Sequence, residues 1–163
     1  MNEELDFIIP EATHADIEVL VEFRCQLQDF ITELNPNLFG LTAGWEEKKR
    51  DQYTGIIDDP KKHLILACSG AGIPIGIGLA SIVEHPDFVP PQFGYVDDLW
   101  VAPEFRRSGV GGRIVESLLK FFEDQGIDHI TLNYVVGNPE AERFWKKLGF
   151  NPVVVAANRS PKT

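Results

Sequence analysis

The sequence predicts a single α/β domain that spans residues 1–163. Its centre is the segment Asp97–Gly112, where a short apolar strand runs through a glycine-rich loop into a helix with apolar residues at helical spacing. A second indication is the segment 63–84, where two strand patterns flank Gly70–Gly72 and predict an antiparallel hairpin. The third is length, because 163 residues suffice for one hydrophobic core and are too few for two.

The first half of the chain predicts one strand and two helices ahead of the hairpin. A short strand at Phe7–Ile9 precedes Thr13, which with Asp16 forms the pattern of a capping box. The helix that follows carries an apolar stripe over residues 17–34 and ends at Asn-Pro-Asn. A second, more polar helix is predicted over Trp45–Ile57, and it is either a substrate lid or a surface connection.

The second half predicts further strands with two helices between them. One helix begins at Val110 and ends before Gly126, which suits the C′ position. Another begins at Asn138, a good N-cap that is followed by proline at the first helical position. From the hairpin onward, the strand patterns cover His63–Ser69, Ile73–Glu84, Phe93–Val101, His129–Val136 and Val153–Ala156.

The composition excludes several classes of function. The net charge of -10 disfavours nucleic acid as a partner, because contacts to phosphates dominate that affinity. No apolar run approaches the ~20 residues of a membrane helix, and the acidic N-terminus carries no secretory signal, so we expect a cytoplasmic protein. Cys25 and Cys68 are too few for a disulfide framework and badly spaced for a metal site, so no metal is expected.

The loop before the helix at Val110 predicts an anion-binding site. Free N–H groups at a helix start, with the positive end of the helix dipole behind them, attract phosphate, and glycines let that backbone approach closely. The residues concerned are Gly109, Gly111, Gly112, Arg106, Arg107 and Arg113. Neither a Walker loop nor a dinucleotide fingerprint fits, since Ile114 stands at the last glycine position of the latter. The alternative is an ordinary strand-to-helix turn with solvated arginines.

Two spaced motifs in the second half carry a resemblance to a known family. Arg106, Gly109 and Gly111 match the pattern Arg/Gln-x-x-Gly-x-Gly/Ala. The pattern Asn-x-x-Ala-x-x-Phe-Tyr-x-x-x-Gly-Phe is matched at Asn138, Ala141, Phe144, Gly149 and Phe150. Together they resemble the GNAT superfamily of acyl-CoA-dependent N-acetyltransferases. The resemblance implies a mixed sheet, flanked by about four helices, that splays open between its fourth and fifth strands.

The resemblance also implies the reaction and the cofactor contacts. Acetyl-CoA would be the co-substrate, without a metal, and its acetyl group would pass to a primary amine by direct attack in a ternary complex. Loop amides would bind the pyrophosphate of coenzyme A, and the backbone of the fourth strand would pair with its pantetheine arm. The cofactor-binding residues implied are Leu99, Trp100, Val101, Arg106, Arg107, Ser108, Gly109, Val110, Gly111, Gly112, Asn138 and Lys146.

Acetyl transfer to an amine requires a base, and two adjacent aspartates are the candidates. Asp97 is favoured, because it shares strand parity with Leu99 and Val101, although a bulge would switch the choice to Asp98. Glu84 and His85 are held in reserve. Alternatively, the aspartates only bind a cationic substrate or finish the strand at its solvated end.

The acid that protonates the leaving thiolate is less clear from the sequence. Where the family pattern often has a tyrosine, this chain has Trp145, whose N–H cannot transfer a proton at neutral pH. Tyr134, on the fifth strand, is the substitute that the sequence offers, and water is another. A non-catalytic CoA-binding sensor or regulatory domain of the same fold is therefore the alternative function, and an unrelated phosphate-binding domain is a third.

The acceptor and the oligomeric state stay open at this stage. The amine belongs to a small molecule or a peptide: a polyamine, an amino acid, an amino sugar, a protein N-terminus or a lysine. Aromatic residues that can shape its pocket are Phe30, Phe39, Trp45 and Phe88. Only 13 residues follow Phe150, where the family commonly adds two strands, so an exposed sheet edge predicts a homodimer.

Overall fold

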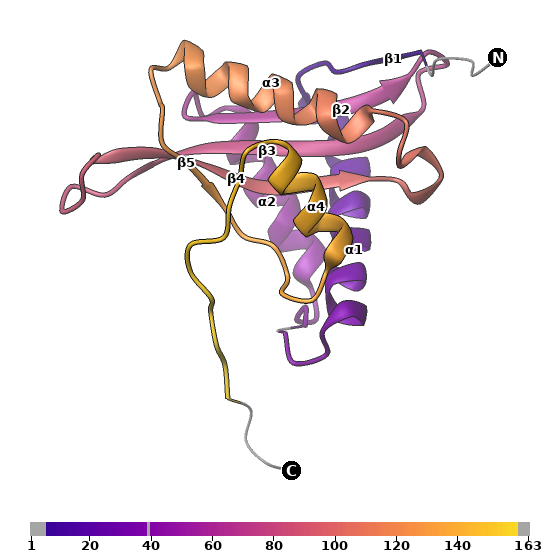
Figure 1. The fold of residues 1–163 in the computed structure, drawn as a ribbon. Coiled ribbons are helices and arrows are strands. Elements are labelled where there is room, and N and C mark those ends of the chain that lie inside the picture. The colour runs from indigo at the N-terminus through magenta and orange to yellow at the C-terminus, as the bar shows by residue number, and fades with distance from the viewer. Residues whose placement is uncertain (1–5, 39, 160–163) are drawn as a thin grey trace.

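A computed structural model describes residues 6–38 and 40–159, and it forms one sheet with helices on both faces (Figure 1). No helix among these residues is long and apolar enough to cross a membrane. In chain order the elements are β1 (Phe7–Ile8), α1 (Ile17–Leu34), α2 (Trp45–Ile57), β2 (Lys62–Ser69), β3 (Pro74–Glu84), β4 (Gln92–Val101), α3 (Val110–Asp124), β5 (Ile130–Leu132) and α4 (Pro139–Lys147), with single 3₁₀ turns at His14–Asp16 and Pro103–Phe105.

The sheet is mixed, as the sequence predicts. Its strand order is β1-β2-β3-β4-β5, in which the first three pairs are antiparallel and β4 and β5 are parallel. β5 pairs only with Gly94–Val96, so β4 has no partner on that side from Asp97 to Val101 in the described part of the chain. The predicted opening between the fourth and fifth strands is therefore confirmed.

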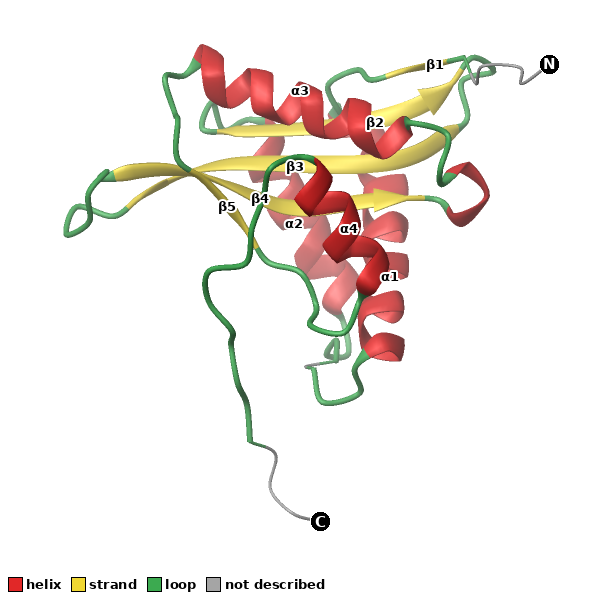
Figure 2. Ribbon diagram, viewed as in Figure 1, coloured by secondary structure: helices red, strands yellow, loops and turns green. Residues whose placement is uncertain are grey.

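Figure 2 shows helices on both faces of the sheet, and two hydrophobic cores hold these layers together. On one face, α3 and α4 pack on the sheet through residues such as Ile114, Leu118 and Phe122. A Cβ added to Gly94 of β4 would lie 2.7 Å from the Phe122 ring, so glycine is needed for this close approach. On the other face, α1 and α2 cover the remaining apolar side chains of the strands, with Tyr53 fully buried among them.

The early elements form where the sequence places them. Both helix ranges, 17–34 and 45–57, are confirmed. The Asp16 carboxylate accepts hydrogen bonds from the N–H and the hydroxyl of Thr13 at 2.7 and 2.8 Å, which fixes the turn that leads into α1. The N-cap prediction at Asn138 is also confirmed, since its Oδ1 accepts from the Ala141 N–H at 3.2 Å.

Two strand predictions near the C-terminus are wrong. The strand expected over His129–Val136 is confined to Ile130–Leu132, because β4 diverges after Val96 and leaves the following residues without a neighbour. Val153–Ala156 forms no strand, and residues 151–159 are irregular and exposed. An apolar segment forms a strand only when a sheet edge pairs with it. In Figure 1 this tail runs away from α4, and the Asn158 side-chain amide donates to the Asn37 carbonyl at 2.8 Å, so its end is bonded to the segment after α1.

Candidate active site

The register between β3 and β4 contains a bulge at the two aspartates. Leu79 pairs with Asp98 and Ala80 pairs with Val96, so Asp97 is the extra residue on β4. A bulge re-aims the side chains around it and often marks a functional site. The loss of pairing with β5 begins at the same residue. At Asp97, β4 therefore loses its β5 neighbour, and the alternation of its side chains between the two faces of the sheet shifts by one residue.

The bulge corrects the parity argument for the base. Leu99 and Val101 pack on the α3 side of the sheet. Asp97 instead accepts a short hydrogen bond from the hydroxyl of Ser81, and Asp98 binds α1, so both carboxylates lie on the face that α1 and α2 cover. The prediction that Asp97 shares a face with Leu99 and Val101 is therefore wrong. The bulge that would make Asp98 the candidate base is present.

Asp98 is a buried carboxylate held by one arginine. The Nε of Arg24 on α1 lies 3.3 Å from its Oδ1, and both side chains are largely buried. The other two guanidinium nitrogens of Arg24 donate to Gln28 Oε1, each at 3.2 Å. Asp98 thus connects the sheet to α1, and its acceptor lone pairs are partly engaged.

Asp97 is the more accessible of the two carboxylates. Its residue is exposed, yet the surrounding protein partly desolvates it, and this raises the pKa of Asp97 above that of an ordinary aspartate. The Ser81 hydrogen bond and the charge of Lys62 oppose that rise. Lys62 Nζ itself donates to Ser81 Oγ at 2.8 Å, so Ser81 links the lysine to the carboxylate.

α2 adds a lysine and a tyrosine to the same face. The Lys49 ammonium lies 4.8 Å from the centre of the Tyr53 ring. The Tyr53 hydroxyl is buried and has no hydrogen-bond partner among the described residues. Burial raises the pKa of Tyr53, and the negative charge of Asp98 adds to this.

Sequence reasoning missed the residues that surround the aspartates. Arg24 and Ser81 bind them, Lys62 binds Ser81, and Lys49 and Tyr53 lie within electrostatic reach of Asp98. They belong to α1, α2, β2 and β3, and none of them forms a local motif with Asp97 or Asp98. The only sequence signal was the placement of basic residues within otherwise amphipathic segments, which is common on solvated surfaces.

The glycine-rich loop has the backbone geometry of an anion cradle. Arg107 and Gly109 both adopt left-handed conformations, with φ of 62° and 87°. Gly109 is the N-cap of α3, so the N–H groups of the first helical turn, at Val110–Gly112, have no intrahelical acceptors. A Cβ at Gly109 or Gly112 would meet nothing within 4 Å, so the outer side of the loop is open. This geometry fits a pyrophosphate.

Two side chains of this loop serve the protein itself. Arg106 Nε donates to the Val101 carbonyl at 3.0 Å, and its guanidinium stacks over the rings of Trp100 and Phe30 at 4.5 and 5.1 Å. The Ser108 hydroxyl donates to the Phe105 carbonyl. Both contacts fix the loop against β4, so the groups left to face an anion are the backbone amides and the arginines that follow.

The backbone of β4 is divided between its two neighbours. The Trp100 carbonyl faces β3, since a Cβ at Gly76 would lie 2.7 Å from it, and the Ala102 N–H donates to Ile75 at 2.9 Å. Alternation along a strand then directs the N–H and C=O groups of Leu99 and Val101 to the open edge. Of the three strand residues implied by the resemblance, these two present that edge.

The residues predicted on the far side of the opening lie around α4. Lys146 forms an ion pair with Glu142 at 2.7 Å, which raises the pKa of Lys146. Tyr134 lies within electrostatic reach of the same ammonium. Trp145 is buried and packs edge-on against Phe144 and Phe150, so it is a core residue.

The residues held in reserve lie elsewhere. Glu84 is bound by Lys61 at 2.7 Å, and His85 stacks on the exposed Phe88 with ring centres 3.7 Å apart. Trp45 packs with the core under α1 and α2. Phe39 lies outside the described residues.

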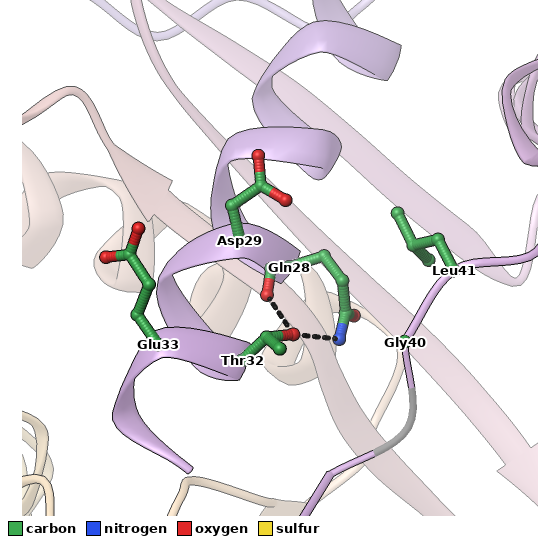
Figure 3. Close-up of a pocket in the computed structure, with 6 residues that line it drawn as sticks. All are labelled: Gln28, Asp29, Thr32, Glu33, Gly40 and Leu41. Carbon is green, nitrogen blue, oxygen red and sulfur yellow. Dashed lines mark hydrogen bonds between the residues drawn. The ribbon is translucent and has the colours of Figure 1, made fainter. Parts of the chain in front are cut away.

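Two surface cavities flank α1. One of about 500 Å³ lies between its C-terminal half and the following loop (Figure 3). Gln28 points into it, toward Thr32 and the Gly40–Leu41 backbone, and the same side chain is bound to Arg24. The other, of about 440 Å³, lies between α1 and the Pro103 turn. Neither is lined by Asp97, and no cluster of potential metal ligands occurs among residues 6–38 and 40–159.

The chain resembles known proteins in sequence and in fold. Residues 27–150 match the sequence profile of the Acetyltransferase (GNAT) family. No curated protein matches the chain in sequence.

Solved structures share the fold over nearly the whole chain. A transcriptional regulator from Bacillus halodurans C-125 is 19% identical, with a TM-score of 0.74 over 94% of this chain and 99% of that one. The aminoglycoside antibiotic 6'-N-acetyltransferase AAC(6')-Ih from Acinetobacter baumannii is 16% identical, with a TM-score of 0.71 over 96% and 99%. A predicted acetyltransferase with acetyl-CoA from Clostridium acetobutylicum is 17% identical, with a TM-score of 0.74 over 94% and 96%. At these identities the similarity establishes the fold alone.

Proposed function

Because the chain belongs to the Acetyltransferase (GNAT) family, we propose that it transfers an acetyl group from acetyl-CoA to a primary amine by direct attack within a ternary complex. One observation carries the proposal: the edge of β4 that β5 leaves open begins at Asp97 and leads directly to the N-terminus of α3. Asp97 and Asp98 lie at the start of that edge, on the face under α1 and α2. A backbone edge and a carboxylate pair therefore lie on one strand, and the anion cradle follows that strand in the chain.

The backbone of this chain supplies most of the proposed cofactor contacts. The N–H groups of Arg107–Gly112 bind the pyrophosphate, with Arg107 adding positive charge. The N–H and C=O of Leu99 and the N–H of Val101 pair with the amides of the pantetheine arm, because the Val101 carbonyl already accepts from Arg106. Asn138 and Lys146 approach from α4. When bound, acetyl-CoA supplies the activated acetyl thioester.

Asp97 acts as the base in this proposal. An alkyl ammonium has a pKa near 10.4, as lysine does, so a proton must leave before the nitrogen attacks. Asp97 takes that proton, directly or through water, because it is accessible, whereas Asp98 is paired with Arg24. As the C–N bond forms and the thioester C–S bond breaks, the Leu99 N–H stabilises the negative charge on the carbonyl oxygen.

The leaving thiolate needs a proton, and Tyr134 is the proposed donor. Trp145 stands at the position where the family pattern often has a tyrosine, and an indole N–H cannot serve. Tyr134 is half-buried on the α4 side of the opening. Tyr134→Phe is expected to lower kcat and to leave coenzyme A affinity unchanged, and an unchanged kcat would assign the proton to water.

A CoA-binding sensor is the second candidate, and the burial of Trp145 favours it. A side chain fixed in the core at the acid position is what a domain without catalysis would retain. One structure of this fold is that of a transcriptional regulator. Turnover distinguishes the two functions, because both require coenzyme A to bind.

The proposed function is tested with the purified full chain. Release of free coenzyme A from acetyl-CoA is measured against a panel of primary amines, with calorimetric titration of coenzyme A in parallel. Asp97→Asn is expected to lower kcat by about a hundredfold to ten-thousandfold with unchanged coenzyme A affinity. Asp87→Asn, an exposed aspartate in the β3–β4 loop, is the matched control. Binding without turnover on any amine would favour the sensor, and no binding would overturn both functions.

We also propose that the chain forms a homodimer through its C-terminal edge. Val153, Val154 and Val155 are 88%, 83% and 73% exposed, and the outer edge of β5 has no strand partner in the described chain. Two copies can bury these side chains and pair this edge. Light scattering at micromolar concentration is expected to give a dimer that Val154→Lys dissociates, and a wild-type monomer would contradict the proposal. The cytoplasmic location stays a prediction from the sequence.

A further inference from the structure

The charges around the two aspartates are balanced within the protein. Arg24 pairs with Asp98 at 3.3 Å. Lys62 reaches Asp97 through the Ser81 hydroxyl, which accepts from the lysine at 2.8 Å and donates to the carboxylate. Each aspartate therefore already has a basic partner, although the whole chain carries a net charge of -10. A purely cationic acceptor gains little from this pair.

Lys49 brings a third positive charge to this face. Asp98, Arg24 and Asp97 are the charged groups that act on its ammonium, so it faces the same site from α2. Its described contacts are neutral: Gln52 Oε1 at 3.4 Å and the ring of Tyr53 at 4.8 Å. Its Nζ forms no ion pair with a described residue, and desolvation lowers the pKa of Lys49, an effect that the charges of Asp98 and Asp97 oppose without cancelling it.

A second polar group on this face also lacks a partner. The Tyr53 hydroxyl is fully buried, lies within electrostatic reach of Asp98 and Arg24, and makes no hydrogen bond among the described residues. Buried hydroxyls in native proteins are nearly always satisfied, so an unsatisfied one needs an explanation. Lys49 and Tyr53 are one helical turn apart, and both can donate to an anion.

We propose that the acceptor carries a carboxylate beside its primary amine, as an amino acid does, and that Lys49 binds this carboxylate while the amine faces Asp97. The inference rests on the proposed acetyl transfer and names the substrate class of the same site. It assigns a specificity role to α2, because Lys49 and Tyr53 both belong to that helix. Polyamines lack the anionic group and meet an excess ammonium.

Matched pairs of amines test the inference. L-Lysine is compared with cadaverine, and L-ornithine with putrescine, because each pair differs only by the carboxylate. The wild-type full chain is expected to show a kcat/KM at least about tenfold higher for the amino acid of each pair, since a charge-assisted hydrogen bond typically contributes this much. Lys49→Met, which keeps the stem and removes the charge, is expected to raise KM for the amino acids and abolish the preference.

Two further variants separate charge from folding. Lys49→Arg is expected to retain the preference, whereas Lys49→Glu is expected to favour the diamines. Lys48→Met is the matched control, because Lys48 is the exposed neighbour of Lys49 on α2, and it is expected to leave the ratio unchanged. Thermal melts followed by circular dichroism verify that each variant is folded.

The outcomes distinguish the inference from the proposed function. Turnover of diamines and amino acids at equal kcat/KM, or a preference that survives Lys49→Met, would overturn the inference and leave acetyl transfer intact. Turnover of neither class would overturn the inference, and the transferase function would fall with it only if the rest of the amine panel also gave no turnover while coenzyme A binding was preserved. The inference would also be overturned if Lys49→Met and Lys48→Met abolished the preference equally. The preference would then depend on the total charge of α2 and not on Lys49.

Discussion

The proposed cofactor loop, Arg106–Gly112, and the proposed acceptor face, the side chains around Asp97 and Asp98, are built in opposite ways. The loop consists of consecutive residues from Arg106 to Gly112, and its binding groups belong to the backbone. The acceptor face consists of side chains from α1, α2, β2, β3 and β4 that meet only in the folded chain. A backbone site is specified by local conformation, so a short motif identifies it. A side-chain site depends on packing between segments that are far apart in the sequence, so a single substitution can disrupt its geometry.

The largest expected effect lies at the Arg24–Asp98 pair. Asp98→Ala removes one partner and leaves a largely buried guanidinium without its carboxylate. Breaking such a pair typically costs about 3 to 5 kcal/mol of unfolding free energy. Urea denaturation followed by circular dichroism measures the loss, with Asp87→Ala as the exposed control. A loss below about 1 kcal/mol would show that α1 is held to the sheet without this pair.

The next effect separates the loop from the acceptor face. Gly109→Val places a β-branched side chain in a left-handed conformation at φ 87°, which costs roughly 1 to 2 kcal/mol, so coenzyme A affinity is expected to fall about tenfold. Gly126→Val introduces the same strain at φ 70° beyond the other end of α3 and serves as the control. Calorimetry measures both affinities. Equal affinities in the two variants would mean that the loop conformation does not determine binding.

The sequence predicted the parts of the fold that local patterns encode. The ranges of α1 and α2 and the N-cap at Asn138 are confirmed. The opening beside the fourth strand, which the family resemblance implied rather than a local pattern, is confirmed as well. The strand predicted at Val153–Ala156 failed because an apolar run does not reveal whether a sheet edge is available to pair with it. The length of the fifth strand failed for the same reason, since its partner diverges at the bulge.

The candidate site divides along the same line. The glycines and arginines of the loop could be recognised from their spacing, although Arg106 proved to bind Val101 and two aromatic rings. Lys49 and Tyr53 could not be recognised, because their proximity to Asp98 arises only when α2 packs on the sheet. The prediction that Asp97 lies on the same face as Leu99 also failed, because one extra residue on β4 reverses the alternation of side chains at that point.

A smaller effect concerns the pH dependence of the acceptor side. Asp97 must be deprotonated to accept a proton, and desolvation raises the pKa of Asp97. The acid limb of kcat/KM is therefore expected above the range of an ordinary aspartate, about 3.9, with activity lost as pH falls through it. Ser81→Ala removes a hydrogen bond that lowers this pKa, so the limb is expected to move to higher pH. Coenzyme A affinity in the same buffers serves as the control. An unmoved limb would show that Asp97 does not govern it.

The smallest expected effect tests whether α4 belongs to the cofactor side. Lys146 is bound to Glu142 at 2.7 Å, so its ammonium is shared between the protein and the proposed phosphate contact. Lys146→Gln is expected to weaken coenzyme A binding about twofold to threefold, and Glu142→Gln, which releases the ammonium, is expected to strengthen it by a similar factor. Lys147→Gln is the neighbouring control. Salt screens exposed charges, so both changes in coenzyme A affinity are expected to shrink as the salt concentration rises from about 50 to about 500 mM. Over that range the Debye length falls to below roughly 5 Å. Opposite shifts from the two variants would place α4 at the cofactor, whereas equal shifts would assign the ion pair to helix stability alone.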